Sequence, residues 1–191
     1  MRNIKDNLAI AALAVAVIWA VYLLDVILPW DLVQLGIRPR RLSGLWGVPV
    51  SPFIHGGLAH ILANTGALFV LLTLSLTYSR RLTAQALGII VLAGGLAVWL
   101  LGGSNTVNVG ASGVIFGLIG FLLFAGIFRK DPWAMLISVV VFILYGGSLV
   151  FGLVPRYGVS WSGHAFGFLS GILAAYLTGS TKKTEAEEEA R

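Results

Sequence analysis

Six apolar runs, separated by short polar links, most strongly constrain how this chain can fold. They are residues 8–28, 58–78, 82–101, 112–128, 133–151 and 160–177. A helix needs about 20 mostly apolar residues to cross a bilayer, and within lipid a helix satisfies its own backbone hydrogen bonds. The sequence therefore predicts an all-α, polytopic membrane protein with six transmembrane helices in one bundle.

The composition supports a membrane protein. Hydrophobic residues make up 58% of the chain and charged residues 11%, whereas a soluble domain carries roughly 25% charged residues. The net charge is +5, but the basic residues lie in pairs between the apolar runs and form no single patch. We therefore expect the lipid bilayer, and no nucleic acid, as a partner.

The distribution of basic residues predicts the topology. If the first helix starts inside, nine basic residues lie on the inner side and four on the outer side. The inner set is Arg2, Lys5, Arg80, Arg81, Arg129, Lys130, Lys182, Lys183 and Arg191, and the outer set is Arg38, Arg40, Arg41 and Arg156. Cytoplasmic loops are enriched in Lys and Arg, so both termini are predicted to be cytoplasmic.

The chain divides into two parts by composition. Residues 1–178 form the predicted membrane domain, and residues 179–191 form a charged tail with too few apolar residues for a core, which predicts disorder. The first run is longer than a signal-peptide core, so we expect it to be retained. The small size and lack of a targeting extension favour a prokaryotic plasma membrane.

Three polar residues stand near the starts of alternate apolar runs: His60, Ser112 and His164. The second, fourth and sixth helices all enter from the outer face in the predicted topology, so these residues share one depth. Ionisable groups inside a membrane are costly and usually functional. We therefore expect a site that opens to the outer face.

A serine hydroxyl attacks only when a base within hydrogen-bond reach takes its proton. The sequence predicts Ser112 as nucleophile and His164 as general base. Glycines recur every three or four residues on both helices and would allow close approach. These are Gly113, Gly117 and Gly120 on the fourth helix and Gly163, Gly167 and Gly171 on the sixth.

An oxyanion formed by attack on an amide needs preorganised donors. His60 and Asn64 are four residues apart and share a helix face. The start of the fourth helix offers free backbone N–H groups, including that of Ser112. We predict that these donors form the oxyanion site.

The acidic residues limit the chemistry. None of the eight acids falls within the second to sixth helices: Asp6, Asp25, Asp31, Asp131, Glu185, Glu187, Glu188 and Glu189. A Ser–His dyad is thus predicted in place of a triad. A His-Glu-x-x-His zinc motif and a pair of facing aspartates are both missing from the sequence. Cysteine is absent too, so we expect no metal and no cofactor.

Three motifs resemble the rhomboid family of intramembrane serine proteases, and the similarity spans nearly the whole chain. They are His55-Gly-Gly-Leu-Ala-His60-Ile-Leu-Ala-Asn64, Gly110-Ala-Ser112-Gly113 and His164-Ala-Phe-Gly167-Phe-Leu-Ser-Gly171. The resemblance implies Ser112 as nucleophile, His164 as base and His60 with Asn64 at the oxyanion. It also implies transmembrane protein substrates, which enter near the second and fifth helices beneath the loop at residues 152–159. Phe116 departs from the best-known bacterial pattern, which has an aromatic hydroxyl there.

Other interpretations remain open at this stage. Ser112 could simply cap a helix, Asn64 could bond a neighbouring helix, and His55 could tie down the first loop. A proteolytically inactive rhomboid-fold protein that binds membrane helices is the alternative function. A transporter is disfavoured because the membrane runs lack charge pairs. The substrate and the oligomeric state are left open by the sequence.

Overall fold

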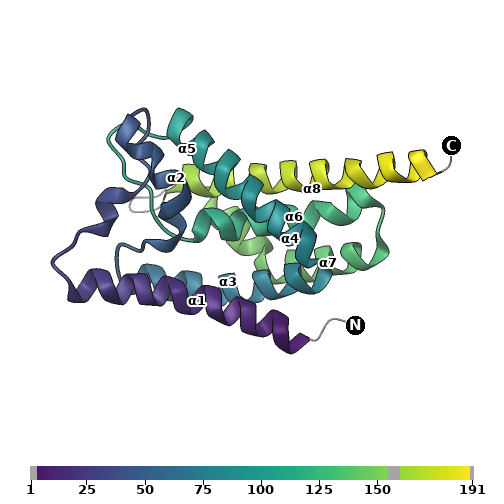
Figure 1. Cartoon of the computed structure of the whole chain (residues 1–191), viewed down its shortest axis with the longest axis horizontal. Coiled ribbons are helices and arrows are strands. Elements are labelled where there is room, and N and C mark those ends of the chain that lie inside the picture. Colours follow the sequence, from purple (N-terminus) through teal and green to yellow (C-terminus); the bar gives the residue numbers. More distant parts are fainter. Residues whose placement is uncertain (1–3, 155–159, 190–191) are drawn as a thin grey trace.

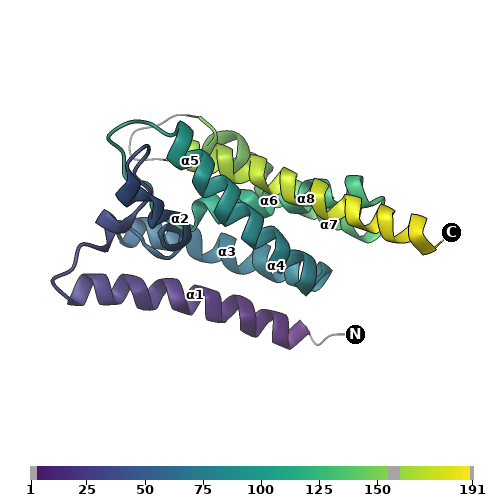
Figure 2. The same ribbon diagram turned by 45° about the horizontal axis from the view of Figure 1, so that its top comes forward.

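The computed structural model describes residues 4–154 and 160–189, and within them the chain is helical, with one isolated backbone bridge between Ile37 and Asn108. The long helices run roughly along one direction (Figures 1 and 2). They are α1 (Ile4–Ile27), α3 (Leu58–Tyr78), α4 (Arg80–Ile89), α5 (Gly95–Leu101), α6 (Ser112–Arg129), α7 (Pro132–Gly152) and α8 (Trp161–Glu189). A π-helical turn, η4 (Ile90–Gly94), joins α4 to α5 in one continuous helical run.

Five helical runs in the described residues are long and apolar enough to cross a membrane. They are α1, α3, the α4–α5 run, α6 and α7. This confirms a polytopic helical membrane protein, and the predicted ends of these runs lie within a few residues of the observed ones. The sixth predicted span begins as the helix α8.

The charged tail differs from the sequence-based expectation. The backbone of α8 continues as a helix to Glu189, through residues 179–189, where the sequence predicts disorder. Figure 1 shows this end of α8 projecting beyond the rest of the bundle. The domain boundary at residue 178 stays a prediction.

The central helix of the bundle is α6. It has 61% of its span buried, against 11% for α1 and 17% for α7. Leu118 and Phe121 of α6 are fully buried, whereas Phe142 and Ile143 of α7 are 66% and 74% exposed. Such large apolar surfaces on α7 fit contact with lipid rather than water.

Glycine brings α6 and α8 into backbone contact, as the sequence predicts. A Cβ atom on Gly167 would overlap the carbonyl oxygen of Gly113, and one on Gly171 would overlap that of Gly117. Small residues permit this close approach between membrane helices. This glycine contact between the two helices therefore fixes α8, and with it His164, against the start of α6.

The first loop is folded into short helical turns: η1 (Leu32–Leu35), η2 (Leu42–Leu45), α2 (Gly47–Val50) and η3 (Ser51–Phe53). Arg40 anchors it, donating hydrogen bonds to the carbonyls of Leu100 at 3.0 Å and Gly102 at 2.9 Å. Such donors satisfy carbonyls that a helix leaves free at its C-terminus. The loop is thus held against the end of α5.

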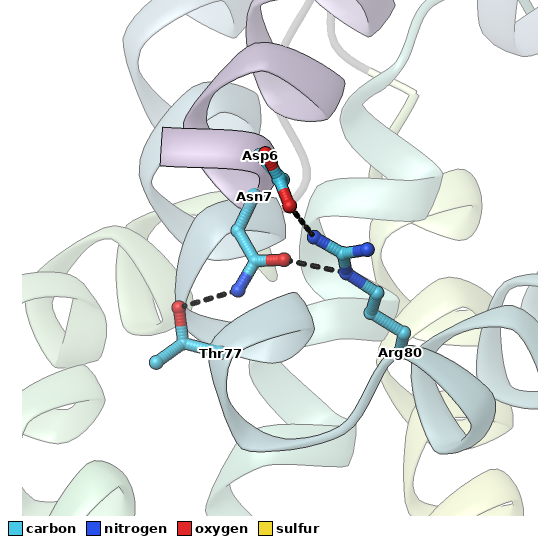
Figure 3. A network of polar contacts seen from close by, with 4 residues as sticks. All are labelled: Asp6, Asn7, Thr77 and Arg80. Carbon is cyan, nitrogen blue, oxygen red and sulfur yellow. Dashed lines mark hydrogen bonds and ion pairs between the residues drawn. The ribbon is translucent and has the colours of Figure 1, made fainter. Parts of the chain in front are cut away.

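A polar network joins three helices at the opposite end of the bundle, where α1 begins and α8 ends (Figures 1 and 3). Arg80 donates from Nε to Asn7 Oδ1 at 2.7 Å and forms an ion pair with Asp6 at 3.4 Å. Asn7 in turn donates to Thr77 Oγ1 at 3.3 Å. The network ties α1 to the turn between α3 and α4.

Candidate active site

The turn before α6 is shaped by Gly110. Its φ is +112°, a region that L side chains rarely adopt, and its N–H donates to the Ser51 carbonyl at 2.9 Å. A Cβ at this position would lie 2.5 Å from His60 Nε2 and 3.6 Å from Asn64 Nδ2. Glycine thus lets the backbone just before Ser112 approach both side chains of α3.

His55 holds the same turn from the other side. It is 2% exposed, and its Nε2 accepts a hydrogen bond from the Ala111 N–H at 3.3 Å. Burial, followed by the nearby His60, lowers the pKa of His55 from 6.5 to about 4. A neutral imidazole is what an acceptor nitrogen requires, so His55 ties the first loop to the start of α6.

Ser112 is the first helical residue of α6. The N-cap is Ala111, whose own side chain makes no capping bond. Ser112 is half-buried and lines a cavity of about 50 Å³ together with Asn108, Ser160 and Gly163. A cavity of this size can hold water.

His164 packs against the same end of α6. Its ring stacks on Phe116, with centroids 4.1 Å apart and planes 2° from parallel. Phe116 lies four residues after Ser112 and so occupies the same helix face. His164 Nδ1 lies 2.8 Å from the Gly152 carbonyl oxygen. Within the described residues no hydrogen bond joins Ser112 Oγ to His164.

The start of α8 is fixed by a polar bridge that sequence reasoning missed. Ser160 accepts from the Gly163 N–H at 3.3 Å and donates to Asn108 Oδ1 at 2.5 Å. Asn108 also pairs with Ile37 through both backbone groups. No motif marks this bridge, because Asn108 lies in a polar link that resembles any loop.

Asn64 is 5% exposed, and its Nδ2 is buried without a hydrogen-bond partner among the described residues. Buried polar groups are nearly always paired, so an unpaired donor calls for an explanation. The residues from which the sequence predicts catalysis thus gather at one end of the bundle: His60 and Asn64 beside the Gly110 turn, and Ser112 and His164 on facing helices. Of the predicted gating loop, residues 155–159 lie outside the described part of the chain.

Comparison with known proteins places this chain in a family. A Rhomboid domain model matches residues 42–181. The uncharacterized protein Rv1337 of Mycobacterium tuberculosis is 40% identical over 88% of this chain and 74% of its own length. YdcA of Bacillus subtilis, assigned provisionally as a rhomboid protease, is 27% identical over 88% of this chain and 86% of its own.

A third relative is named as a rhomboid protease. The rhomboid protease GluP of Bacillus subtilis is 28% identical over 79% of this chain and 30% of its own length. The match to the domain model covers well over half of the chain, and the helical bundle agrees with it. This chain is an integral membrane protein that belongs to the rhomboid family of intramembrane serine proteases.

Proposed function

We propose that this protein is an intramembrane serine endopeptidase that hydrolyses peptide bonds in or near the transmembrane segments of membrane-protein substrates. Ser112 is the nucleophile, and His164 is the general base of a Ser–His dyad. The observation that carries the proposal is the stacking of His164 on Phe116, one turn after Ser112. It sets the imidazole against the helix face that bears the hydroxyl.

The absence of a hydrogen bond between Ser112 and His164 among the described residues is compatible with the proposal. Catalytic hydrogen bonds are often long in unliganded enzymes and tighten when substrate binds. Helix capping does not account for Ser112, because the N-cap position of α6 belongs to Ala111 and Ser112 is the residue after it. Its hydroxyl is therefore available for chemistry.

The oxyanion site comprises His60, Asn64 and the backbone N–H of Ser112. The unpaired Asn64 Nδ2 beside the Gly110 turn supports this role, since a hydrogen bond to a neighbouring helix would have left it paired. The N–H groups in the first turn of α6 have no partner within the helix. Their dipole also favours negative charge at this point.

Cleavage of a model transmembrane substrate by protein in liposomes tests the function. Ser112→Ala and His164→Ala should each abolish cleavage, whereas Ser104→Ala, on an exposed serine at the same end of the bundle, should cleave as the wild type does. Cleavage that survives either active-site substitution would contradict the dyad. A folded wild type that binds the substrate without cutting it would favour the inactive helix-binding alternative.

The orientation is part of the proposal: both termini are cytoplasmic, and the site opens to the outer face of a prokaryotic plasma membrane. The chain has no cysteine, so a maleimide can react only with a cysteine that is introduced by substitution. In inverted and right-side-out vesicles, an impermeant maleimide should label Ser104→Cys from outside and Lys130→Cys from inside. The opposite pattern would invert the topology.

A further inference from the structure

The ring of His164 makes a polar contact that the proposed dyad does not use. His164 Nδ1 lies 2.8 Å from the Gly152 carbonyl oxygen. A carbonyl oxygen can only accept, so the proton of this bond must belong to Nδ1. In the neutral ring Nε2 then carries the lone pair, which is the state that a base for Ser112 requires.

Gly152 is the last residue of α7. The last four carbonyls of a helix have no N–H partner within it, and the C-terminus carries partial negative charge that favours a cation nearby. The bond therefore does two things for His164: it selects the tautomer, and it stabilises the imidazolium formed when the ring takes a proton. In a Ser–His–Asp triad the carboxylate performs both tasks.

The identity of residue 152 follows from space, not from backbone conformation. Gly152 is not among the described residues whose φ lies in the positive region that disfavours side chains, so it adopts a backbone that other residues can adopt. A Cβ at Gly152 would overlap Phe116 Cζ and lie 3.3 Å from His164 Nδ1. Glycine lets the helix end reach a ring that Phe116 already covers on one face.

We propose that the Gly152 carbonyl is the positioning group of the catalytic histidine, acting in place of the missing carboxylate. The inference rests on the proposed function. It makes the C-terminus of α7 part of the active site. If this helix end moves away from α8, His164 can adopt the other tautomer and becomes a weaker base for Ser112. No proton leaves Nδ1 during the step; Nε2 alone accepts the Ser112 proton and later returns it to the leaving amine.

The tautomer can be measured directly by ¹⁵N NMR of protein labelled at histidine. The chain has only three histidines, and the His164→Gln spectrum identifies the ring signals of His164 by their loss. At a pH where the imidazole is neutral, we expect the proton on Nδ1. A proton on Nε2 in the folded wild type would overturn the proposal.

A substitution at the helix end provides the second arm. Gly152→Ala should reduce both the Nδ1–H population and the rate at which a fluorophosphonate probe labels Ser112, by roughly tenfold or more; a wrong histidine tautomer costs a serine protease up to about 10⁴-fold. The matched control is Gly147→Ala on the same helix, because a Cβ there meets nothing within 4 Å. It should label within about twofold of the wild type.

The NMR measurement and the Gly152→Ala variant together distinguish the ways in which the proposal can fail. If Gly152→Ala keeps both the wild-type tautomer and the wild-type labelling rate, the positioning role is wrong. If Gly152→Ala does not fold, the tautomer of the wild type still decides. A wild type that shows the Nδ1 proton but no reaction at Ser112 would contradict the proposed function while supporting the contact.

Discussion

The two ends of the bundle treat polar residues in opposite ways. At the end where α1 begins, Arg80 bonds Asn7 and Asn7 bonds Thr77 (Figure 3), and Ser75 bonds Thr83 at 2.7 Å. Arg80 Nη2 is buried there without a hydrogen bond, but it forms an ion pair with Asp6. At the other end, Asn64 Nδ2 is buried with no hydrogen-bond partner among the described residues.

This difference separates stability from function. A buried polar group with its partner contributes about 1 kcal/mol, and one without a partner costs about 1–3 kcal/mol. The site end therefore carries a cost that the fold alone does not explain, as is common at catalytic sites. Substitutions at the two ends should then have opposite consequences for stability and activity.

The largest effect is expected at the dyad. Ser112→Ala and His164→Ala should each lower the cleavage rate by about 10⁴-fold or more, because without its base or its oxygen the site cannot form the acyl intermediate. Unfolding in detergent should change by less than about 1 kcal/mol. If a variant loses activity only in proportion to the fraction of molecules that are unfolded, the substituted residue stabilises the fold and takes no part in the reaction.

The oxyanion donor comes next. Asn64→Ala should lower kcat by about 10²–10³-fold, the usual effect of removing one such donor. Its stability should stay level or rise, because an unpaired buried amide is removed. Kinetics with a transmembrane substrate and denaturant unfolding measure the two quantities. Lost stability with full activity would show that Asn64 is a structural residue.

The opposite end should show the reverse pattern. Arg80→Ala should lower the free energy of unfolding by about 1–3 kcal/mol, because it leaves the oxygen of the buried Asn7 amide without its donor. Cleavage per folded molecule should remain within about twofold. The neighbouring Arg81→Ala, at an exposed position, is the matched control and should change neither quantity.

The smallest effect is expected at His55, in a pH titration of stability. Its folded-state pKa of about 4 lies below the usual 6.5, so the unfolded chain binds the proton more readily. The neutral His55 ring therefore makes its full contribution to the free energy of unfolding above pH 6.5. This contribution is lost as the pH falls toward 4, by about 1–2 kcal/mol between pH 7 and pH 5.

His55→Gln isolates this contribution. A glutamine oxygen can still accept from the Ala111 N–H, but it does not titrate. The difference in stability between wild type and variant should therefore shift in favour of the variant as the pH falls. A difference that is constant from pH 7 to pH 5 would show that His55 is not buried as a neutral ring.

The sequence predicts the helices well because length and hydropathy dictate them. It also predicts the close seam of α6 and α8, because glycine at four-residue spacing has few other uses between membrane helices. The helical extension of α8 to Glu189 was not predicted. A charged segment with too few apolar residues for a core is expected to be disordered. It can still be helical where it continues a helix that packs against the bundle.

The site was predictable only where side chains carry the chemistry. His60, Ser112 and His164 stand out in apolar surroundings, and Phe116 could be located from the resemblance. The Gly152 contact uses a backbone carbonyl, which every residue possesses, so no pattern identifies it. The bridge from Ser160 to Asn108 depends on how two loops meet, which is a tertiary property.

The most direct test of the central claim is covalent labelling of the folded protein with a fluorophosphonate probe, followed by peptide mapping. We expect one adduct, on Ser112, that disappears in His164→Ala and persists in Arg80→Ala. An adduct on another serine, or labelling of Ser112 that does not depend on His164, would contradict it.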